Sequence, residues 1–173
     1  MRSLAVVVVT AAVLAVAACG SGDDAPAPPP PAPVREVTPP GPFFGECGSV
    51  TDDEVARAFA VPPFTDVTRN SVGCEWESGG VGGPSVTFSW YRGSPIGRER
   101  AGSDLIGRPA EDISIDGNPG FLASAEDYLC ELGVQFGGDF VHWSVTYNGF
   151  IPTADPCDVA RELAELSVSR SAK

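Results

Sequence analysis

Four cysteines constrain the fold of this chain more than any other sequence feature. Cys47 and Cys74 are 27 positions apart, and so are Cys130 and Cys157. An even number of cysteines in an exported chain is typical of disulfides, and four cysteines allow three pairings. Cys47 precedes a helix signal and Cys157 lies at a second helix start, whereas Cys74 and Cys130 each open a predicted strand. The spacing therefore favours Cys47–Cys74 and Cys130–Cys157, each joining a terminal helix to a sheet. A four-cysteine metal site is disfavoured because no C-x-x-C pair is present.

The N-terminus indicates export and lipidation. Arg2 precedes an apolar run over residues 4–18 that only Thr10 interrupts. Such a run is short for a transmembrane helix and typical of a signal peptide. It ends in VAAC, where small residues precede Cys19 as in a bacterial lipobox. We predict a lipoprotein signal peptide over residues 1–18 and a lipid anchor on Cys19. The alternative is an ordinary secretory signal with a chance cysteine.

A proline-rich segment follows the predicted lipid anchor. Residues 20–42 contain nine of the 17 prolines and no apolar periodicity. Proline-rich chain favours extended polyproline II at about 3.1 Å per residue, so this segment spans roughly 70 Å. We interpret residues 19–42 as the lipidated cysteine with its tether, or as a spacer without a length requirement. Residues 43–173 remain as a single globular domain.

The charge of the chain excludes one class of partner. It has 11 Lys+Arg against 23 Asp+Glu, a formal net charge of −12. Nucleic-acid binding depends on neutralising phosphates, so no nucleic-acid partner is expected. The same excess of acid argues against the domain lying flat on an anionic membrane.

Helix and strand signals predict a two-layer α+β domain. Thr51 and Glu54 form a capping box at the start of one helix, and Asp155 with Pro156 begins the last helix. Between them, hairpin-connected strands imply an antiparallel sheet, which the N-terminal and C-terminal helices cover on one face. We expect the tryptophans in these strands to pack in the core; the alternative is that they line a ligand pocket. The predicted strands lie in residues 73–77, 85–90, 111–124 (a hairpin turning at 116–120), 128–136 and 139–147, and the tryptophans are Trp76, Trp90 and Trp143.

Arginines cluster around a predicted short helix over residues 95–106, which Ser94 and Pro95 would begin. Their planar guanidinium groups suit carboxylate or phosphate, so they form a candidate anion or partner patch. The alternative is that they pair with the chain's own excess carboxylates. The four arginines are Arg92, Arg98, Arg100 and Arg108.

No motif indicates catalysis, a metal or a cofactor. The single histidine, His142, alternates with core positions and should lie on the opposite face of its strand. Neither G-x-S-x-G nor H-E-x-x-H is present. Asp112–Gly117 matches the first half of an EF-hand loop, but Ala123 stands where the bidentate glutamate belongs. We therefore predict no catalytic residues, no metal and no cofactor.

Several motifs together carry a family resemblance. They are NSVGCEW, FSWYRGSPIGRER, EDISIDGNPGF, LCELGVQF and PCDVARELA. With the lipobox layout and the four later cysteines, the chain resembles the LprB-type lipoproteins of mycobacteria, part of an actinobacterial family built on a domain of unknown function. The resemblance implies a lipid-anchored protein on the extracytoplasmic face of the cell membrane, with no assigned reaction or ligand.

Two functions remain open at this point. The first is a non-catalytic lipoprotein domain that binds an envelope ligand or docks on a membrane-protein partner. The second is an envelope hydrolase or transferase in which an acidic pair such as Asp112 and Asp116 transfers protons. A pocket or patch is enough for the first, whereas the second needs ionisable groups that converge.

Overall fold

The computed structural model describes residues 38–171. The predicted signal peptide, Cys19 and most of the predicted tether lie outside these residues. The elements follow the order η1 (Glu46–Ser49), α1 (Asp52–Phe59), β1 (Asp66–Asn70), β2 (Gly73–Glu77), β3 (Ser85–Tyr91), α2 (Ile96–Leu105), β4 (Ala110–Ile115), β5 (Asn118–Ala125), β6 (Leu129–Phe136), β7 (Asp139–Thr146) and α3 (Pro156–Arg170).

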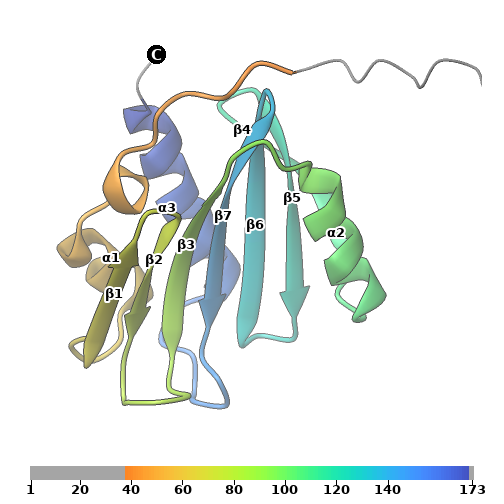
Figure 1. Cartoon of the computed structure of the whole chain (residues 1–173). Helices are drawn as coiled ribbons and strands as arrows, with labels where there is room; N and C mark the ends of the chain where they lie inside the picture. The colour runs from red at the N-terminus through yellow and green to blue at the C-terminus, as the bar shows by residue number, and fades with distance from the viewer. Residues whose placement is uncertain (1–37, 172–173) are drawn as a thin grey trace, which may run out of the picture. The chain divides into compact units, whose positions relative to one another are not determined.

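The described strands form one antiparallel sheet in the order β1-β2-β3-β7-β6-β5-β4 (Figure 1). Hairpins join β2 to β3, β4 to β5, β5 to β6 and β6 to β7, as the turn residues predict. β7 returns between β3 and β6, so the last strand lies at the centre of the sheet. The predicted α+β class with an antiparallel sheet is confirmed.

The two terminal helices begin as their capping residues predict. Glu54 N donates to the side chain of Thr51, and the Glu54 carboxylate accepts from Thr51 N at 2.9 Å, which completes the capping box. At α3, the Asp155 carboxylate accepts from the backbone N–H groups of Cys157 and Asp158, and Pro156 stands at the first helical position.

The core lies between these helices and one face of the sheet. Trp143 of β7 stacks with Trp76 at a centroid distance of 5.9 Å and contacts Phe88 at 5.0 Å. Val159 and Leu163 of α3 are buried against the same layer. The Tyr147 hydroxyl donates to Phe59 O at 3.2 Å, which ties the end of α1 to the core. Trp76 and Trp143 are therefore core residues.

α2 lies on the opposite face of the sheet. Glu131 and Gly133 of β6 face α2, whereas the alternate residues Leu132 and Val134 are buried in the main core. Figure 1 shows α2 beside β5 at one edge, away from α1 and α3. The sequence predicted this helix without placing it on a face. Its N-cap is Pro95, without a side-chain capping bond, so the helix begins at Ile96, one residue after the predicted start.

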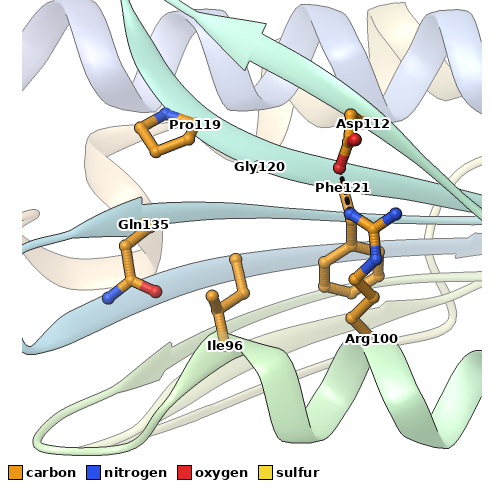
Figure 2. Close-up of a pocket in the computed structure, with 7 residues that line it drawn as sticks. All are labelled: Ile96, Arg100, Asp112, Pro119, Gly120, Phe121 and Gln135. Carbon is orange, nitrogen blue, oxygen red and sulfur yellow. Dashed lines mark hydrogen bonds and ion pairs between the residues drawn. The ribbon is translucent and has the colours of Figure 1, made fainter.

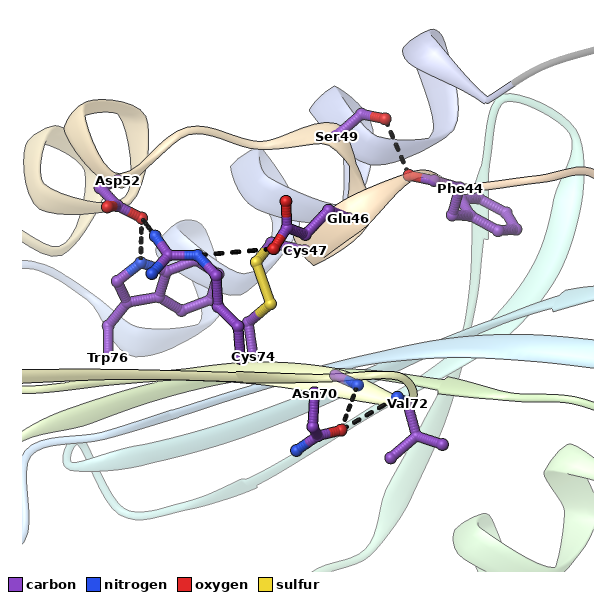
Figure 3. The surroundings of a disulfide bond; sticks show 11 residues. Phe44, Glu46, Cys47, Ser49, Asp52, Asn70, Val72, Cys74 and Trp76 are labelled. Atoms are coloured by element: carbon purple, nitrogen blue, oxygen red, sulfur yellow. Dashed lines mark hydrogen bonds and ion pairs between the residues drawn. A yellow bond between two sulfur atoms is a disulfide. The ribbon is translucent and has the colours of Figure 1, made fainter.

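Both predicted disulfides are present. The Cα atoms of Cys47 and Cys74 are 5.3 Å apart, and those of Cys130 and Cys157 are 5.1 Å apart. The first bridge joins η1 to β2 (Figure 3) and the second joins α3 to β6. Each therefore holds a helical segment against a strand.

Two local features differ from the sequence prediction. β1 was not predicted, because Asp66–Asn70 is an edge strand with a single partly buried position and shows no apolar alternation. The turn expected over residues 116–120 consists of Asp116 and Gly117 alone, with φ of 48° and 78°. Positive φ at both central residues matches a type I′ hairpin turn, so β5 already begins at Asn118.

Candidate functional site

Arg108 is held by a carboxylate of the same chain. Its Nη2 atom donates to both oxygens of Glu131 at 2.9 Å, and the Ser103 hydroxyl donates to Glu131 at 3.0 Å. The side chains of Arg108 and Glu131 are only 20% and 17% exposed. This arrangement fixes the end of α2 to β6, and it makes Arg108 a structural ion-pair partner.

Arg100 has a similar attachment closer to the surface. One Nη atom donates to Ala110 O at 2.9 Å and the other forms an ion pair with Asp112 (Figure 2). The side chain of Asp112 is 88% exposed, so water competes for this carboxylate. Arg100 and Arg108 therefore form ion pairs with carboxylates of the same chain.

Arg92 and Arg98 present their charge to solvent. The side chain of Arg98 is 75% exposed, and its neighbour Glu99 lies 3.9 Å away. The Arg92 guanidinium lies 4.8 Å from the centre of the Trp90 ring and donates to Ser71 O at 3.2 Å. Of the four arginines proposed as a patch, these two have the freer charge, and Arg92 lies against an aromatic surface.

Trp90 and Arg92 line an open groove beside the β1–β2 turn. Two adjoining hollows of about 290 and 340 Å³ share Val72, Trp90 and Arg92, and Phe43 also lines the first of them. We call these four residues the Trp90 groove. Phe43 and Val72 are large apolar residues with 63% and 57% of their surface exposed. Apolar side chains that remain exposed around a concave surface indicate a binding site.

Three separate segments place the groove residues. Trp90 is near the end of β3, and its backbone N–H donates to Val72 O at 2.8 Å. The Asn70 side chain accepts from the N–H groups of Val72 and Gly73, which fixes the β1–β2 turn (Figure 3). The Cys47–Cys74 disulfide holds the segment after Phe43 against β2. The groove is therefore assembled before any ligand arrives.

A buried carboxylate supports the groove from the other side. Asp139 is 3% exposed, and its two oxygens accept from Gly41 N at 3.1 Å and Gly93 N at 2.9 Å. In addition, Gly138 N donates to Pro39 O at 2.7 Å. The β6–β7 turn thus binds both the segment that leads to Phe43 and the loop that follows Arg92. The last residues of the predicted tether contact the domain.

The groove combines aromatic, apolar and cationic groups. The Phe43 and Phe44 rings contact Trp90 edge-on at centroid distances of 5.5 and 5.8 Å. Trp90 Nε1 has no hydrogen-bond partner among the described residues. Trp90 lies on the core face as predicted, but it is half-buried and its ring forms part of the groove. A ring face beside a guanidinium suits a ligand that carries both an apolar or sugar ring and an anionic group.

The acidic residues considered for proton transfer do not form a pair. Asp112 is in the middle of β4 and bound to Arg100, whereas Asp116 lies in the turn after that strand. No group of three or more His, Cys, Asp or Glu residues within residues 38–171 is placed to hold a metal ion.

His142 lies on the α2 side of β7, opposite the core face, as its alternation predicts. Its ring is 6.4 Å from the Tyr91 ring and 6.2 Å from the Phe121 ring, between centroids. Burial lowers the pKa of His142 below its usual 6.5, although the nearby carboxylates of Glu131 and Glu99 oppose this shift. His142 therefore binds a proton less readily in the folded chain than in the unfolded chain.

This lowered pKa predicts a pH dependence of stability. Below about pH 6.5 the unfolded chain binds a proton at His142 before the folded chain does, so the free energy of unfolding falls as the pH falls through that value. The chain has one histidine. His142→Gln should therefore remove most of the change in the free energy of unfolding between pH 7.5 and 5.5. Urea unfolding at several pH values measures it. An unchanged slope in the variant would contradict the assignment.

Within the described residues, no helix has the length and apolar character needed to cross a membrane.

Comparison with known proteins confirms the resemblance seen in the motifs. The family model described as "Protein of unknown function (DUF3558)" matches residues 14–170. "Putative lipoprotein LprB" of Mycobacterium tuberculosis (strain ATCC 25618 / H37Rv) is 47% identical over 137 residues, which cover 76% of this chain and 74% of the relative. The protein of the same name from Mycobacterium leprae is 44% identical over 137 residues, covering 76% of this chain and 72% of the relative.

No solved structure matches the chain. Neither the family description nor the names of these relatives indicates an enzymatic activity. The family match spans most of the chain, and the chain belongs to the DUF3558 family of proteins of unknown function.

Proposed function

We propose that this chain is a lipoprotein, anchored through Cys19 on the extracytoplasmic face of the cell membrane, whose domain binds an envelope ligand in the Trp90 groove without catalysing a reaction. The VAAC sequence and the lipoprotein relatives support the anchor. The observation that carries the binding role is the groove itself, where exposed Phe43 and Val72 flank Trp90 and Arg92.

The alternative of an envelope hydrolase or transferase has less support. Asp112 forms an ion pair with Arg100, and Asp116 belongs to a tight turn. A general acid and base must both lie within reach of the same substrate atoms. The geometry of these two carboxylates offers no such arrangement, so binding remains the proposed role.

The lipid anchor leads to a direct prediction. We expect Cys19→Ala to abolish incorporation of a fatty-acid analogue during metabolic labelling and to leave either uncleaved precursor or unacylated product. More than one acyl chain is needed for stable membrane attachment, so the variant should also leave the membrane fraction or remain there only as precursor. Undiminished label in Cys19→Ala would contradict the proposed anchor.

The groove is tested with a matched pair of phenylalanines. Phe43 is 63% exposed and lines the groove, whereas Phe150 is 54% exposed in the loop after β7. Native mass spectrometry of the full wild-type lipoprotein, purified from its own envelope, should show a retained ligand. In the Phe43→Ala variant, the fraction of protein with bound ligand should be at least tenfold smaller. The control variant Phe150→Ala should retain the ligand.

The role of charge is tested with a second matched pair. We expect Arg92→Gln to lower the retained fraction and to remove its sensitivity to salt, because the Arg92 guanidinium supplies the anion contact. Arg98→Gln removes an exposed arginine that does not line the groove and should have no effect. Equal losses in both variants would indicate general electrostatic attraction, which contradicts a site at Arg92.

A further inference from the structure

A second cavity lies between α2 and the sheet. It has a volume of about 210 Å³, and Phe121 and Ile96 form its apolar walls. Figure 2 shows Ile96 pointing from α2 toward the strands, with Arg100 and Asp112 at one end and Gln135 at the other. We call it the α2 cavity. None of these residues belongs to the Trp90 groove.

The cavity exists because α2 is held by polar contacts and not by an apolar face. The buried residue of α2 is Ser103, whose hydroxyl binds Glu131. Leu105 at the end of the helix is 85% exposed. Asp104 accepts from Ala110 N at 2.8 Å and adds a further polar attachment. A helix attached in this way fills little of the space beneath it.

Gly133 of β6 determines how closely the apolar walls of the cavity approach the sheet. A side chain at Gly133 would place its Cβ 2.6 Å from the Phe121 ring and 3.2 Å from Ile96 Cδ1. Glycine at this position therefore lets Phe121 and Ile96 pack close to β6. The amide nitrogen of Gln135 donates to both Gly137 O and Asp139 O, so Gln135 borders the cavity without offering a free amide N–H group.

Arg100 stands at the mouth of the cavity with a replaceable partner. Its bond to Ala110 O fixes the guanidinium, and the Arg100 side chain remains 34% exposed. Its other partner, Asp112, is 88% exposed and can rotate into water at small cost. An incoming carboxylate or phosphate would form the same kind of ion pair with Arg100 in place of the Asp112 carboxylate.

We propose that the α2 cavity binds a small amphipathic anion, in which a phosphate monoester or carboxylate is joined to a short apolar group. The apolar group lies on Phe121 and Ile96, and the anion displaces Asp112 from Arg100. The volume holds roughly seven water-sized groups, which limits the buried part to a chain or ring of about that size. This site is separate from the Trp90 groove and goes beyond the function proposed above.

Hexyl phosphate is a suitable probe, since it joins a phosphate to six carbons. We expect ³¹P NMR titration of the full lipoprotein in a maltoside detergent to show saturable binding. Inorganic phosphate, which lacks the chain, should bind at least tenfold more weakly. Ile96→Phe fills the cavity and should weaken hexyl phosphate binding at least tenfold. Arg100→Gln should weaken it to a similar extent.

The decisive variant is Asp112→Asn. It removes the carboxylate that competes for Arg100, so we expect hexyl phosphate to bind several-fold more tightly, a gain that a damaged fold would not produce. Arg98→Gln is the charge control on the same helix, and Phe43→Ala is the control for the Trp90 groove. Neither control should change the affinity.

Several results would overturn the proposal. They are the absence of saturable binding, binding that is unchanged by Ile96→Phe, and binding that is unchanged or weakened by Asp112→Asn. Loss of binding in Phe43→Ala instead of Ile96→Phe would place the anion in the Trp90 groove and would likewise overturn a site beneath α2. These outcomes are independent of the native ligand test, so either site can fail without the other.

Discussion

Removing the Cys130–Cys157 disulfide, as Cys130→Ala with Cys157→Ala, is expected to lower the free energy of unfolding by roughly 3–4 kcal/mol. The bridge closes a loop between residues 27 positions apart, and its absence allows the unfolded chain many more conformations. It also joins the first turn of α3 to β6, next to the centre of the sheet. Urea unfolding under non-reducing conditions measures the loss.

The other disulfide provides the comparison. Cys47–Cys74 has the same sequence separation, so its removal should lower the free energy of unfolding by a similar amount. Its removal should additionally loosen the Phe43 side of the Trp90 groove and weaken the retained ligand, whereas removal of Cys130–Cys157 should not. Equal loss of ligand in both double variants, measured at a temperature where both are folded, would contradict this difference.

Trp143→Ala should destabilise the domain by about 3–5 kcal/mol, the range for truncation of a buried tryptophan. Trp143 is fully buried on β7 and contacts Trp76 and Phe88 at the centre of the core. Small side chains at this position leave a cavity that the packed rings cannot close. Thermal and urea unfolding of the purified variant would measure the change.

The two stacked tryptophans should differ when each is replaced by phenylalanine. Trp76 Nε1 donates to Asp52 at 2.8 Å, and this bond lowers the pKa of Asp52 together with Arg69. Trp143 Nε1 has no partner among the described residues. Trp76→Phe therefore loses a hydrogen bond, whereas Trp143→Phe removes a buried donor that was unpaired. Trp143→Phe should be the milder substitution, and the reverse order would show that Trp143 Nε1 is satisfied in solution.

Local signals in the sequence predicted much of the fold. The capping box at Thr51 and the Asp155–Pro156 helix start depend on residues within one turn of each other, so a short window contains the whole signal. The disulfides could be inferred because each cysteine stands at the boundary of a predicted element. β1 was missed because its residues are mostly exposed, and its pairing with β2 is what makes it a strand.

The candidate site depended on contacts that no local pattern carries. Phe43, Val72 and Trp90 come from three segments, which the β1–β2 turn and the Cys47–Cys74 bridge bring together. Likewise, Arg108 and Glu131 are 23 positions apart, and only the placement of α2 on β6 joins them. The arginine cluster was visible in the sequence, but the side chains that neutralise part of it were not.

We expect the Trp90 groove to be occupied by a ligand in the cell envelope. Two exposed valines allow a direct test, since Val72 lines the groove and Val81 lies in the β2–β3 loop outside it. We would replace each valine in turn with a photo-crosslinking residue in the full lipoprotein and irradiate intact cells. We predict that the residue at position 72 gives an adduct of defined mass and that Arg92→Gln reduces the amount of this adduct. The residue at position 81 should give no adduct of the same mass. The same adduct from both positions, or none from position 72, would contradict the account.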